Sequence, residues 1–439
     1  MTRSVARRRL RAMAARLYRL LLFCAAPLVR LRLVWRARRE PAYGERQEER
    51  FGVVPSDVPV GPIWFHAVSA GETIGIAPLV HTVGDRAPEL PLLVTTMTPT
   101  GSAQVRERLG DRVAHCYAPY DFAAAVERFY ARVQPRLLIL METELWPNLL
   151  AAAKRRRVPV ALVNARLSER SARGYGRFPS LTQPMLDALT LVCCQYPAHG
   201  ERFCALGLGP ERLQVTGNLK FDQTLPNDTA ARCEQLTQQL ALGPRWLWIA
   251  ASTHEGEDEP MLDAHRALLA VDDQAVLLLV PRHPVRCDAV LALARARSLE
   301  AVPLSQARRE GIGKAKVVIG DSMGELLLLY ALAKLAFVGG SLIEHGGHNP
   351  IEPALAGTPM VMGPSRFNFA EVCALFEGAG ALVSVADGSA LAAVLKAAHD
   401  EPARFVAHAA VAREVVAAQR GVNERLLAAL TPLIEPPSD

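Results

Sequence analysis

The sequence predicts an α/β protein built from two doubly wound domains, each with a parallel β-sheet between layers of helices. The chain has 439 residues, more than one ordinary domain holds. Half of these residues are hydrophobic, which is enough for sizeable cores. Short, almost wholly apolar segments alternate with helical stretches along the chain. Strands of this kind are typical of parallel sheets that are covered on both faces.

The first 39 residues differ in charge from all the others. They contain twelve arginines and no Asp or Glu, so the net charge of +6 leaves about −6 on the remainder (6 minus 12). A nucleic-acid-binding domain would instead carry a basic face, so no nucleic-acid partner is expected. The apolar run Leu20–Val29 is shorter than the roughly 20 residues of a spanning helix, and no small-residue cleavage site follows it.

We therefore expect residues 1–39 to form a membrane-associated helix that lies in, or dips into, the anionic lipids of the cytoplasmic face. A surface helix packed on its own domain is the alternative.

The predicted strands form two groups of five. The first group comprises 62–68, 92–96, 136–141, 158–164 and 190–195, and the second comprises 246–251, 275–281, 316–320, 334–338 and 358–362. This grouping predicts an N-terminal domain at 40–217, a linker at 218–226 and a C-terminal domain at 227–439. The last helical stretch, 410–431, is expected to pack back on the first domain.

Several classes of site are disfavoured. The first strand-to-helix turn, HAVSAGET at 66–73, lacks G-x-G-x-x-G, which argues against a nicotinamide or flavin dehydrogenase but leaves sugar-nucleotide enzymes open. The eight cysteines are scattered without a C-x-x-C pair, as expected of reduced thiols. Glu344, His345 and His348 do not predict a metal site, because nothing in the sequence fixes three ligands on a glycine-rich turn.

Ser69, Gly71 and Glu72 follow the first predicted strand. Gly71 permits a tight turn, and Glu72 would project from the start of a helix. A carboxylate there acts as a general base if an acceptor hydroxyl comes within hydrogen-bond reach. The alternative is a first-turn glutamate that complements the helix dipole.

Glu142 and Glu144 follow a second buried strand, and Arg166 follows the next. Two carboxylates at a strand end are costly unless they are exposed or paired, which favours a role in a site. If Arg166 lies in a cleft at these strand ends, its guanidinium group suits the phosphates or carboxylates of an acceptor. The alternative is that Arg166 belongs to a solvated charged face.

In the second domain, Ser252 and Arg282 each follow a strand and would meet at a nucleotide phosphate or a sugar carboxylate. Four further residues precede a helix whose free amides suit a phosphate oxygen: Ser322, Met323, Gly324 and Glu325. The acidic run at 255–259 is interpreted as charge at a helix start.

Residues 338–364, VGGSLIEHGGHNPIEPALAGTPMVMGP, carry the most information. A buried strand runs into glycines, which let a backbone approach a ligand closely. A helix is then predicted with Asn349 as its N-cap and Pro350 in its first turn. Glu352, just inside that helix, is positioned to accept hydrogen bonds from a ribose. The pattern predicts a site for a nucleotide that carries a sugar.

Taken together, these segments resemble the Kdo (3-deoxy-D-manno-octulosonic acid) transferases of lipopolysaccharide assembly. The resemblance runs from about residue 17 to the C-terminal region. It rests on eight motifs in order: PAYGERQEERFG, HAVSAGET, METELWPN, NARLSERS, TGNLKFD, PRHPVR, GDSMGEL and GGSLIEHGGHNPIEPA. The arginine-rich extension before residue 17 is longer than the family pattern.

The resemblance implies a glycosyltransferase-B fold of two facing Rossmann-like domains, the first for the acceptor and the second for the donor. It implies a CMP-Kdo donor, a lipid A precursor (lipid IVA) as acceptor, inversion at the anomeric carbon, no cofactor and no required metal. It also implies a location on the cytoplasmic face of the inner membrane.

Individual residues are carried over by their motifs. Glu72 matches the family's general base. Glu352 would hold the ribose and the amides near Gly324 the phosphate, together with the other residues of the donor region: Arg282, Ser322, Met323, Glu325 and Asn349. Glu142 and Glu144 match an acidic family motif. Supporting or acceptor-binding roles are expected for Ser69, Gly71, Arg166 and Ser252.

Three alternatives remain open on the sequence. Another inverting glycosyltransferase of the same fold would use a UDP-sugar and a different lipid acceptor. A sugar-nucleotide epimerase shares the two-domain plan but would not need a membrane-directed segment. An inactive membrane-bound scaffold would retain the fold without the chemistry.

Overall fold

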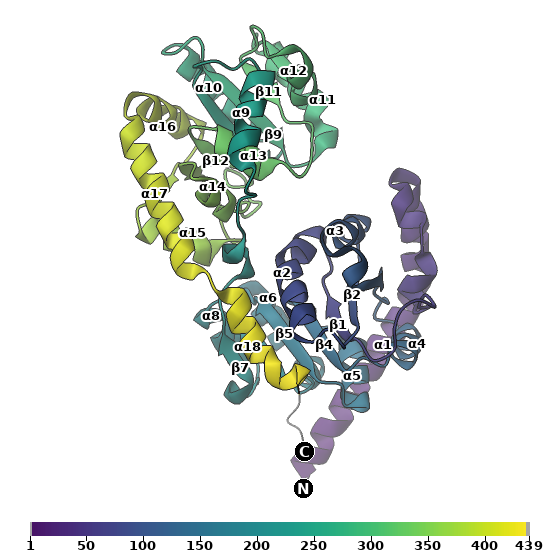
Figure 1. Cartoon of the computed structure of the whole chain (residues 1–439). Coiled ribbons are helices and arrows are strands. Elements are labelled where there is room, and N and C mark those ends of the chain that lie inside the picture. Colours follow the sequence, from purple (N-terminus) through teal and green to yellow (C-terminus); the bar gives the residue numbers. More distant parts are fainter. Residues whose placement is uncertain (1, 436–439) are drawn as a thin grey trace. The chain divides into compact units, whose positions relative to one another are not determined.

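The computed structural model describes residues 2–435 (Figure 1). The chain forms two compact units, Met1–Asp222 with Gly421–Asp439, and Gln223–Arg420. Each unit contains one seven-stranded sheet, and every strand pair in both sheets is parallel. The predicted α/β class with two doubly wound sheets is confirmed.

The first sheet has the strand order β3-β2-β1-β4-β5-β6-β7. Its strands are β1 (Ile63–His66), β2 (Leu92–Thr96), β3 (Ala114–Tyr117), β4 (Leu137–Met141), β5 (Val160–Ala165), β6 (Leu191–Cys194) and β7 (Leu213–Val215). The order reverses next to β1, where Trp64 pairs with Leu93 of β2 on one side and Leu138 of β4 on the other. Ligands of doubly wound sheets bind beyond the carboxyl ends of the strands near such a reversal.

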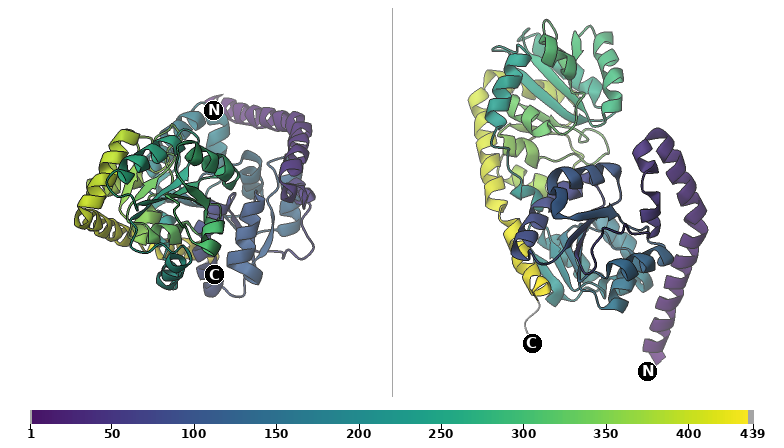
Figure 2. Two further views of the ribbon diagram at one scale, coloured as in Figure 1. Left: turned by 90° about the horizontal axis from the view of Figure 1, so that it is seen from above. Right: turned by 45° about the vertical axis from the view of Figure 1, so that its right-hand side comes forward.

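Within residues 2–435, nine α-helices belong to the first unit. They are α1 (Thr2–Arg39), α2 (Ala70–Arg86), α3 (Pro99–Leu109), α4 (Ala123–Val133), α5 (Pro147–Arg156), α6 (Glu169–Gly176), α7 (Pro179–Leu186), α8 (Pro197–Ala205) and α18 (Val422–Ile434). The last of these comes from the C-terminus, and Figures 1 and 2 show it beside α2. Its Leu426 and Leu430 are buried in the same core cluster as the apolar residues of α2.

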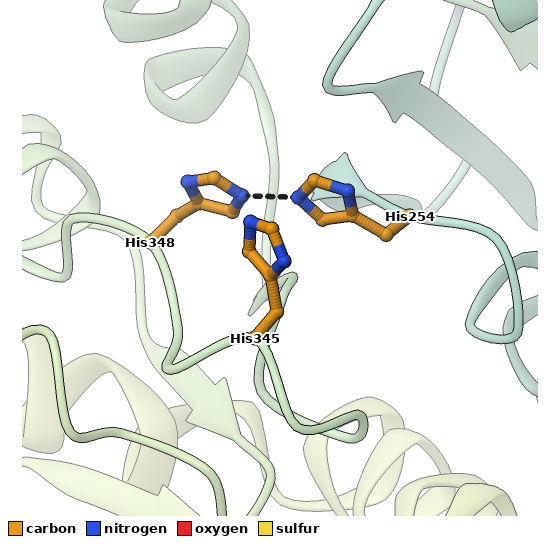
Figure 3. A group of neighbouring side chains, drawn as sticks. All are labelled: His254, His345 and His348. Atoms are coloured by element: carbon orange, nitrogen blue, oxygen red, sulfur yellow. Dashed lines mark hydrogen bonds between the residues drawn. The ribbon is translucent and has the colours of Figure 1, made fainter.

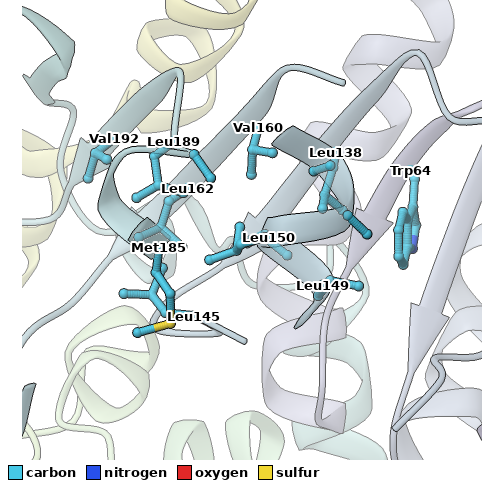
Figure 4. Packing of buried hydrophobic residues seen from close by; sticks show 14 of the residues in the cluster. Trp64, Leu138, Leu145, Leu149, Leu150, Val160, Leu162, Met185, Leu189 and Val192 are labelled. Atoms are coloured by element: carbon cyan, nitrogen blue, oxygen red, sulfur yellow. The ribbon is translucent and has the colours of Figure 1, made fainter. Parts of the chain in front are cut away.

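The first sheet is buried on both faces because successive side chains point to opposite sides of a strand. Trp64 and Leu138 pack in one core cluster, part of which Figure 4 shows. Their neighbours Phe65 and Ile139 pack in the other. This arrangement explains why the strands read as continuous apolar runs.

The helix α1 lies against the first unit along part of its length. The Tyr18 hydroxyl donates to Asp121 (2.9 Å), Arg19 Nε donates to Asn148 Oδ1 (3.0 Å), and Arg11 pairs with Asp187 (3.2 Å). The helix contains Pro27, which removes a backbone hydrogen bond, and Figure 2 shows that α1 changes direction along its length.

The second sheet has the order β10-β11-β9-β8-β12-β13-β14. Its strands are β8 (Leu247–Thr253), β9 (Val276–Pro281), β10 (Ala301–Pro303), β11 (Val317–Ile319), β12 (Ala336–Val338), β13 (Met360–Met362) and β14 (Leu382–Ser384). The helices are α9 (Thr229–Gln239), α10 (Asp258–Leu269), α11 (Cys287–Ala296), α12 (Leu304–Glu310), α13 (Leu326–Leu332), α14 (Ile351–Ala356), α15 (Ala370–Gly378), α16 (Gly388–Asp400) and α17 (Pro402–Gln419).

Two details differ from the expectations. The sequence patterns missed four strands, β3, β7, β10 and β14, and these are the outermost strands of the two sheets. An edge strand is covered less well, so its residues need not be uniformly apolar: β7, for instance, is Leu213–Val215 with two exposed residues. The expected helix at 410–431 is broken at Arg420–Gly421, where Gly421 adopts φ +81°, and α17 and α18 belong to different units.

Candidate active site at the carboxyl ends of the strands

Glu72 lies in the first turn of α2, directly after β1. Its two carboxylate oxygens accept hydrogen bonds from the Val68 backbone N–H (2.9 Å) and the Ser69 hydroxyl (2.8 Å). Ser69 is also the N-cap of α2, because its hydroxyl accepts from the Glu72 N–H (3.4 Å). Gly71 is exposed and an added Cβ would meet no atom within 4 Å, so the approach over this turn is open.

The pKa of Glu72 is raised to about 7, first by burial and then by the nearby Glu142 carboxylate. Glu142 and Glu144 come from the end of β4, which pairs directly with β1. The structure therefore brings together three acidic residues that come from two separate sequence motifs, HAVSAGET and METELWPN. Glu144 accepts a hydrogen bond from Trp146 Nε1 (2.7 Å), and burial raises its pKa as well.

The backbone is strained at the ends of three central strands. Glu142, Asn164 and Ser252 have φ values of +58°, +51° and +59°, in the left-handed region that non-glycine residues rarely adopt. They follow or end β4, β5 and β8, all at the carboxyl edge of their sheet. Such strain persists where the surrounding structure enforces it and concentrates at functional sites.

Arg166 lies in the loop after β5, next to the acidic residues. Its N–H donates to the Glu142 carbonyl (3.4 Å), and its carbonyl accepts from the Thr143 hydroxyl (2.6 Å). The loops after β4 and β5 are therefore tied together. The Arg166 side chain is half-buried.

An apolar groove opens beside Glu144 on α5, α6 and α7. It has a volume of about 430 Å³ and is lined by Leu145, Pro147, Tyr175, Phe178, Leu181 and Met185, among others. Phe178 is 66% exposed, which is unusual for a phenylalanine in a soluble fold. The helix α7 lines one side of this groove and also contacts α1.

In the second unit, Ser252 and Arg282 lie at the ends of the neighbouring strands β8 and β9. The Arg282 N–H donates to the Thr253 carbonyl (2.9 Å), and the Arg282 side chain is exposed. Ser252 is 9% exposed. A Cβ on Gly339 would lie 2.5 Å from the Ser252 carbonyl oxygen. Only glycine therefore allows the chain that leaves β12 to pass this close to the end of β8.

Ser322, Met323, Gly324 and Glu325 form the turn between β11 and α13. The Ser322 hydroxyl donates to Glu325 (2.7 Å), and Arg308 Nη2 donates to both oxygens of the same carboxylate (3.0 Å each). Glu325 is thus held by residues of its own unit. Gly324 has φ +84° with no atom near an added Cβ, and Met323 is 66% exposed, so the turn presents its backbone to solvent.

Asn349 and Glu352 lie at the start of α14. The Asn349 amide donates to Glu352 Oε1 (3.1 Å), and its oxygen accepts from the Ile351 N–H (3.1 Å). The helix begins at Ile351 with Pro350 in the cap position, one residue later than predicted. The shift arises because the Asn349 side chain caps from two residues before the first helical residue.

The sequence interpretation of the acidic run at 255–259 was wrong for Glu257. This carboxylate is fully buried and accepts four backbone hydrogen bonds, from His254 (3.0 Å), Gly340 (2.7 Å), Ser341 (3.0 Å) and Leu342 (3.0 Å). It therefore ties the loop after β8 to the glycine loop after β12. No local signal separates Glu257 from its exposed neighbours, because three of its four partners lie more than eighty residues away.

Among the described residues, one group of side chains is close enough to hold a metal ion: His254, His345 and His348, all in the second unit. Two of the three residues first considered for this role belong to the group. Glu344 does not, and His254 takes its place.

These features define the chain as a two-domain α/β enzyme of the glycosyltransferase-B type, with polar groups at the carboxyl edge of each sheet. Residues 45–223 match a family model described as 3-deoxy-D-manno-octulosonic-acid transferase (kdotransferase). A 3-deoxy-D-manno-octulosonic acid transferase of Haemophilus influenzae is 39% identical over 421 residues, covering 95% of this chain and 98% of the relative. Its counterpart from Bordetella pertussis is 38% identical over 437 residues, covering 94% and 98%. The chain belongs to the Kdo transferase family.

Solved structures support the fold independently. A UDP-N-acetylglucosamine 2-epimerase superposes with a TM-score of 0.59 over 87% of this chain and 99% of its own, at 15% sequence identity. At that identity the likeness shows the shared two-domain fold and does not favour epimerase chemistry.

Proposed function

We propose that this protein transfers Kdo from CMP-Kdo to a lipid A precursor, lipid IVA, with Glu72 as the general base. The observation that carries the assignment of the base is the Glu72 carboxylate, whose pKa of about 7 matches proton transfer near neutral pH. The carboxylate is also oriented by two hydrogen bonds, from Val68 and Ser69. The family membership supports the donor and the acceptor class.

In this mechanism Glu72 takes the proton from the acceptor hydroxyl as the oxygen attacks the anomeric carbon of Kdo. The bond from that carbon to the CMP phosphate breaks, and CMP leaves with the electron pair. Attack from the face opposite to the leaving group inverts the configuration. Glu142 keeps the pKa of Glu72 high enough for the proton to be accepted.

The donor would bind in the second unit, at the edge formed by β8, β9, β11 and β12. Arg282, exposed at the end of β9, suits a phosphate or carboxylate oxygen. The open turn at Gly324 offers backbone amides to the phosphate, and Glu352 is proposed to bind the ribose. Ser252, Ser322, Met323, Glu325 and Asn349 would shape this edge through the contacts described above.

The apolar groove beside Glu144 would receive an acyl chain of the acceptor. Its lining is largely aromatic and aliphatic, and Leu145 in its wall is adjacent in sequence to Glu144. Arg166, in the loop next to Glu142, is proposed to bind a phosphate of the acceptor.

The helix α1 would attach the enzyme to the cytoplasmic face of the inner membrane. Its Arg9–Arg39 portion is, among the described residues, the one helix long and apolar enough to cross a bilayer, and its apolar window has none of its residues buried. Exposed apolar residues occur along most of its length: Leu10, Met13, Leu17, Leu20, Leu21, Phe23, Leu28, Leu31, Val34 and Trp35. Because Tyr18 and Arg19 hydrogen-bond to the folded unit, we propose that α1 lies in the membrane interface and does not span it.

The function is tested by incubating detergent-solubilised full-length protein with CMP-Kdo and lipid IVA and weighing the lipid by mass spectrometry. We expect the mass of the acceptor to rise by whole Kdo residues. Glu72→Ala should abolish transfer and still bind CMP, while Glu89→Ala, which removes an exposed carboxylate of the same unit, should leave transfer unchanged. Turnover of a UDP-sugar without any Kdo transfer would instead support the related glycosyltransferase.

The acceptor groove is tested separately. Phe178→Ser should raise the KM for acylated acceptor and leave the KM for a deacylated analogue unchanged. Val406→Ser, which removes an exposed apolar side chain from α17, is the matched control. An equal loss with both acceptors would contradict an acyl-chain site.

A further inference from the structure

Three imidazole rings converge at the carboxyl ends of two paired strands in the second unit (Figure 3). His254 follows β8, and His345 and His348 lie in the loop after β12. Their ligand nitrogens all lie within 4.8 Å of one another. His254 Nε2 and His348 Nε2 are 2.8 Å apart, and the His345 ring centroid lies 3.9 Å from that of His254.

The loops that carry these rings are fixed in place. Glu257 ties the backbone of His254 to the backbone of Gly340 and the two residues after it. The Gly347 N–H donates to the Gly340 carbonyl (2.7 Å), and Asn368 Nδ2 donates to the His345 carbonyl (2.8 Å). Hydrogen bonds to Glu257 and from Asn368 therefore hold the glycine-rich turn. The tertiary structure fixes the positions of the three histidines, which the sequence does not predict.

Gly340 leaves the space beneath the rings free. It has φ +68°, and an added Cβ would lie 3.1 Å from His348 Cδ2 and 3.5 Å from His345 Cδ2. Any larger residue would be strained in its backbone and would crowd two of the three rings.

Arg282 is a cation close to His254 and His348, and its charge would weaken the binding of a metal ion without blocking it.

We propose that His254, His345 and His348 form a binding site for a divalent transition-metal ion such as Zn²⁺. Three imidazole nitrogens with a fourth open position are a recognised tetrahedral zinc arrangement, with Zn–N distances of about 2.0–2.1 Å. Two such ligand nitrogens lie about 3.3 Å apart in a regular tetrahedron, so the 2.8 Å pair would widen by about half an ångström.

Binding requires one change of tautomer. The proton now shared between His254 Nε2 and His348 Nε2 moves to Nδ1 of the ring that donates it, so that both Nε2 lone pairs face the ion. His345 is exposed, which leaves the fourth position open to water or to a carboxylate or phosphate oxygen. The site is independent of the base chemistry proposed for Glu72, which needs no metal.

The test uses untagged full-length protein that has been stripped of metal with a chelator and then freed of the chelator. Co²⁺ is titrated first, because tetrahedral Co²⁺ with nitrogen ligands absorbs strongly in the visible range and octahedral Co²⁺ does not. Zn²⁺ is then titrated by calorimetry and by displacement of Co²⁺. We expect one ion per chain and a tetrahedral Co²⁺ spectrum.

His345→Ala and His348→Ala should each weaken Zn²⁺ binding by about tenfold or more. His345 is exposed, so its replacement should not alter thermal unfolding. His81→Ala, in the first unit, is the control for adventitious binding to a histidine and should bind Zn²⁺ as the unmodified chain does. The proposal is overturned by an octahedral Co²⁺ spectrum, by the absence of saturable binding, or by undiminished affinity in His345→Ala.

Discussion

The Ser69 hydroxyl donates a hydrogen bond to the Glu72 carboxylate (2.8 Å) and accepts one from the Glu72 backbone N–H (3.4 Å). The residue pair that begins α2 is therefore the same pair that orients the proposed base. Helix capping and the proposed general-base role depend on the same arrangement, since the cap holds the carboxylate in a single orientation at the end of β1.

Replacing Ser69 by Ala should therefore alter both catalysis and stability. Loss of the hydroxyl removes a hydrogen bond that favours the charged carboxylate, so the pKa of Glu72 should rise above its value of about 7. The acidic limb of the kcat/KM profile should move to higher pH, and the free energy of unfolding should fall by about 1 kcal/mol.

Thr98→Ala is the matched control for this cap. Thr98 caps α3 by accepting from the Gly101 N–H (3.0 Å), so its loss should cost a similar free energy of unfolding without moving the pH profile. If the pH profile moved equally in both variants, the shift would not come from the hydrogen bond between Ser69 and Glu72, and the prediction would be wrong.

Glu142→Gln should have the opposite effect on the pH profile. The Glu142 carboxylate is the second-largest cause of the raised pKa of Glu72, after burial, whereas Glu144 contributes least. Neutralising Glu142 should lower the pKa of Glu72 and move the acidic limb of kcat/KM to lower pH. Glu144→Gln should move it less, and a larger shift with Glu144→Gln would contradict this ordering.

Glu72→Gln should stabilise the fold in alkaline solution while it abolishes transfer. The folded-state pKa of about 7 lies above the ordinary value of 4.5, so the stabilising contribution of Glu72 is present below about pH 4.5. It is lost as the pH rises through 7, because the buried carboxylate must then ionise. Thermal unfolding should give Glu72→Gln a higher Tm than the unmodified chain at pH 8 and a nearly equal Tm at pH 5.

Glu257→Gln should destabilise the second unit. An amide offers one acceptor oxygen where the carboxylate serves four backbone donors, so about 2–3 kcal/mol of unfolding free energy should be lost. Glu255→Gln, two residues earlier and exposed, should change it by less than about 0.5 kcal/mol. Denaturant unfolding measures both variants, and equal stability would mean that the glycine loop does not depend on Glu257.

Charges placed among the exposed apolar residues of α1 should weaken binding to membranes. Leu17→Glu with Leu20→Glu puts two carboxylates among residues that are 56% and 58% exposed. Co-sedimentation with vesicles containing phosphatidylglycerol should fall, because apolar contact is lost and anionic lipids repel the new charges. Val406→Glu on α17 should leave co-sedimentation unchanged, and a double variant that still sediments fully would argue against attachment through these residues of α1.

The sequence by itself determined the ten central strands, the parallel sheets and the family. Strands buried on both faces must be apolar throughout, and this leaves a signal in the chain that needs no partner to be recognised. The motifs after those strands determined which residues to examine, from Glu72 to Glu352. The edge strands, such as β7, left no such signal, because one side of each borders on solvent or loops.

Only the tertiary structure decided which of these residues lie together. The neighbourhood of Glu72 and Glu142 follows from the pairing of β1 with β4, and it adds to the effect of burial in raising the pKa of Glu72. Glu257 reads like its exposed neighbour Glu255, yet it is buried because its donors come from a loop more than eighty residues away. His254 joins His345 and His348 for the same reason: charge, burial and ligand geometry depend on distances in space, which spacing along the chain does not record.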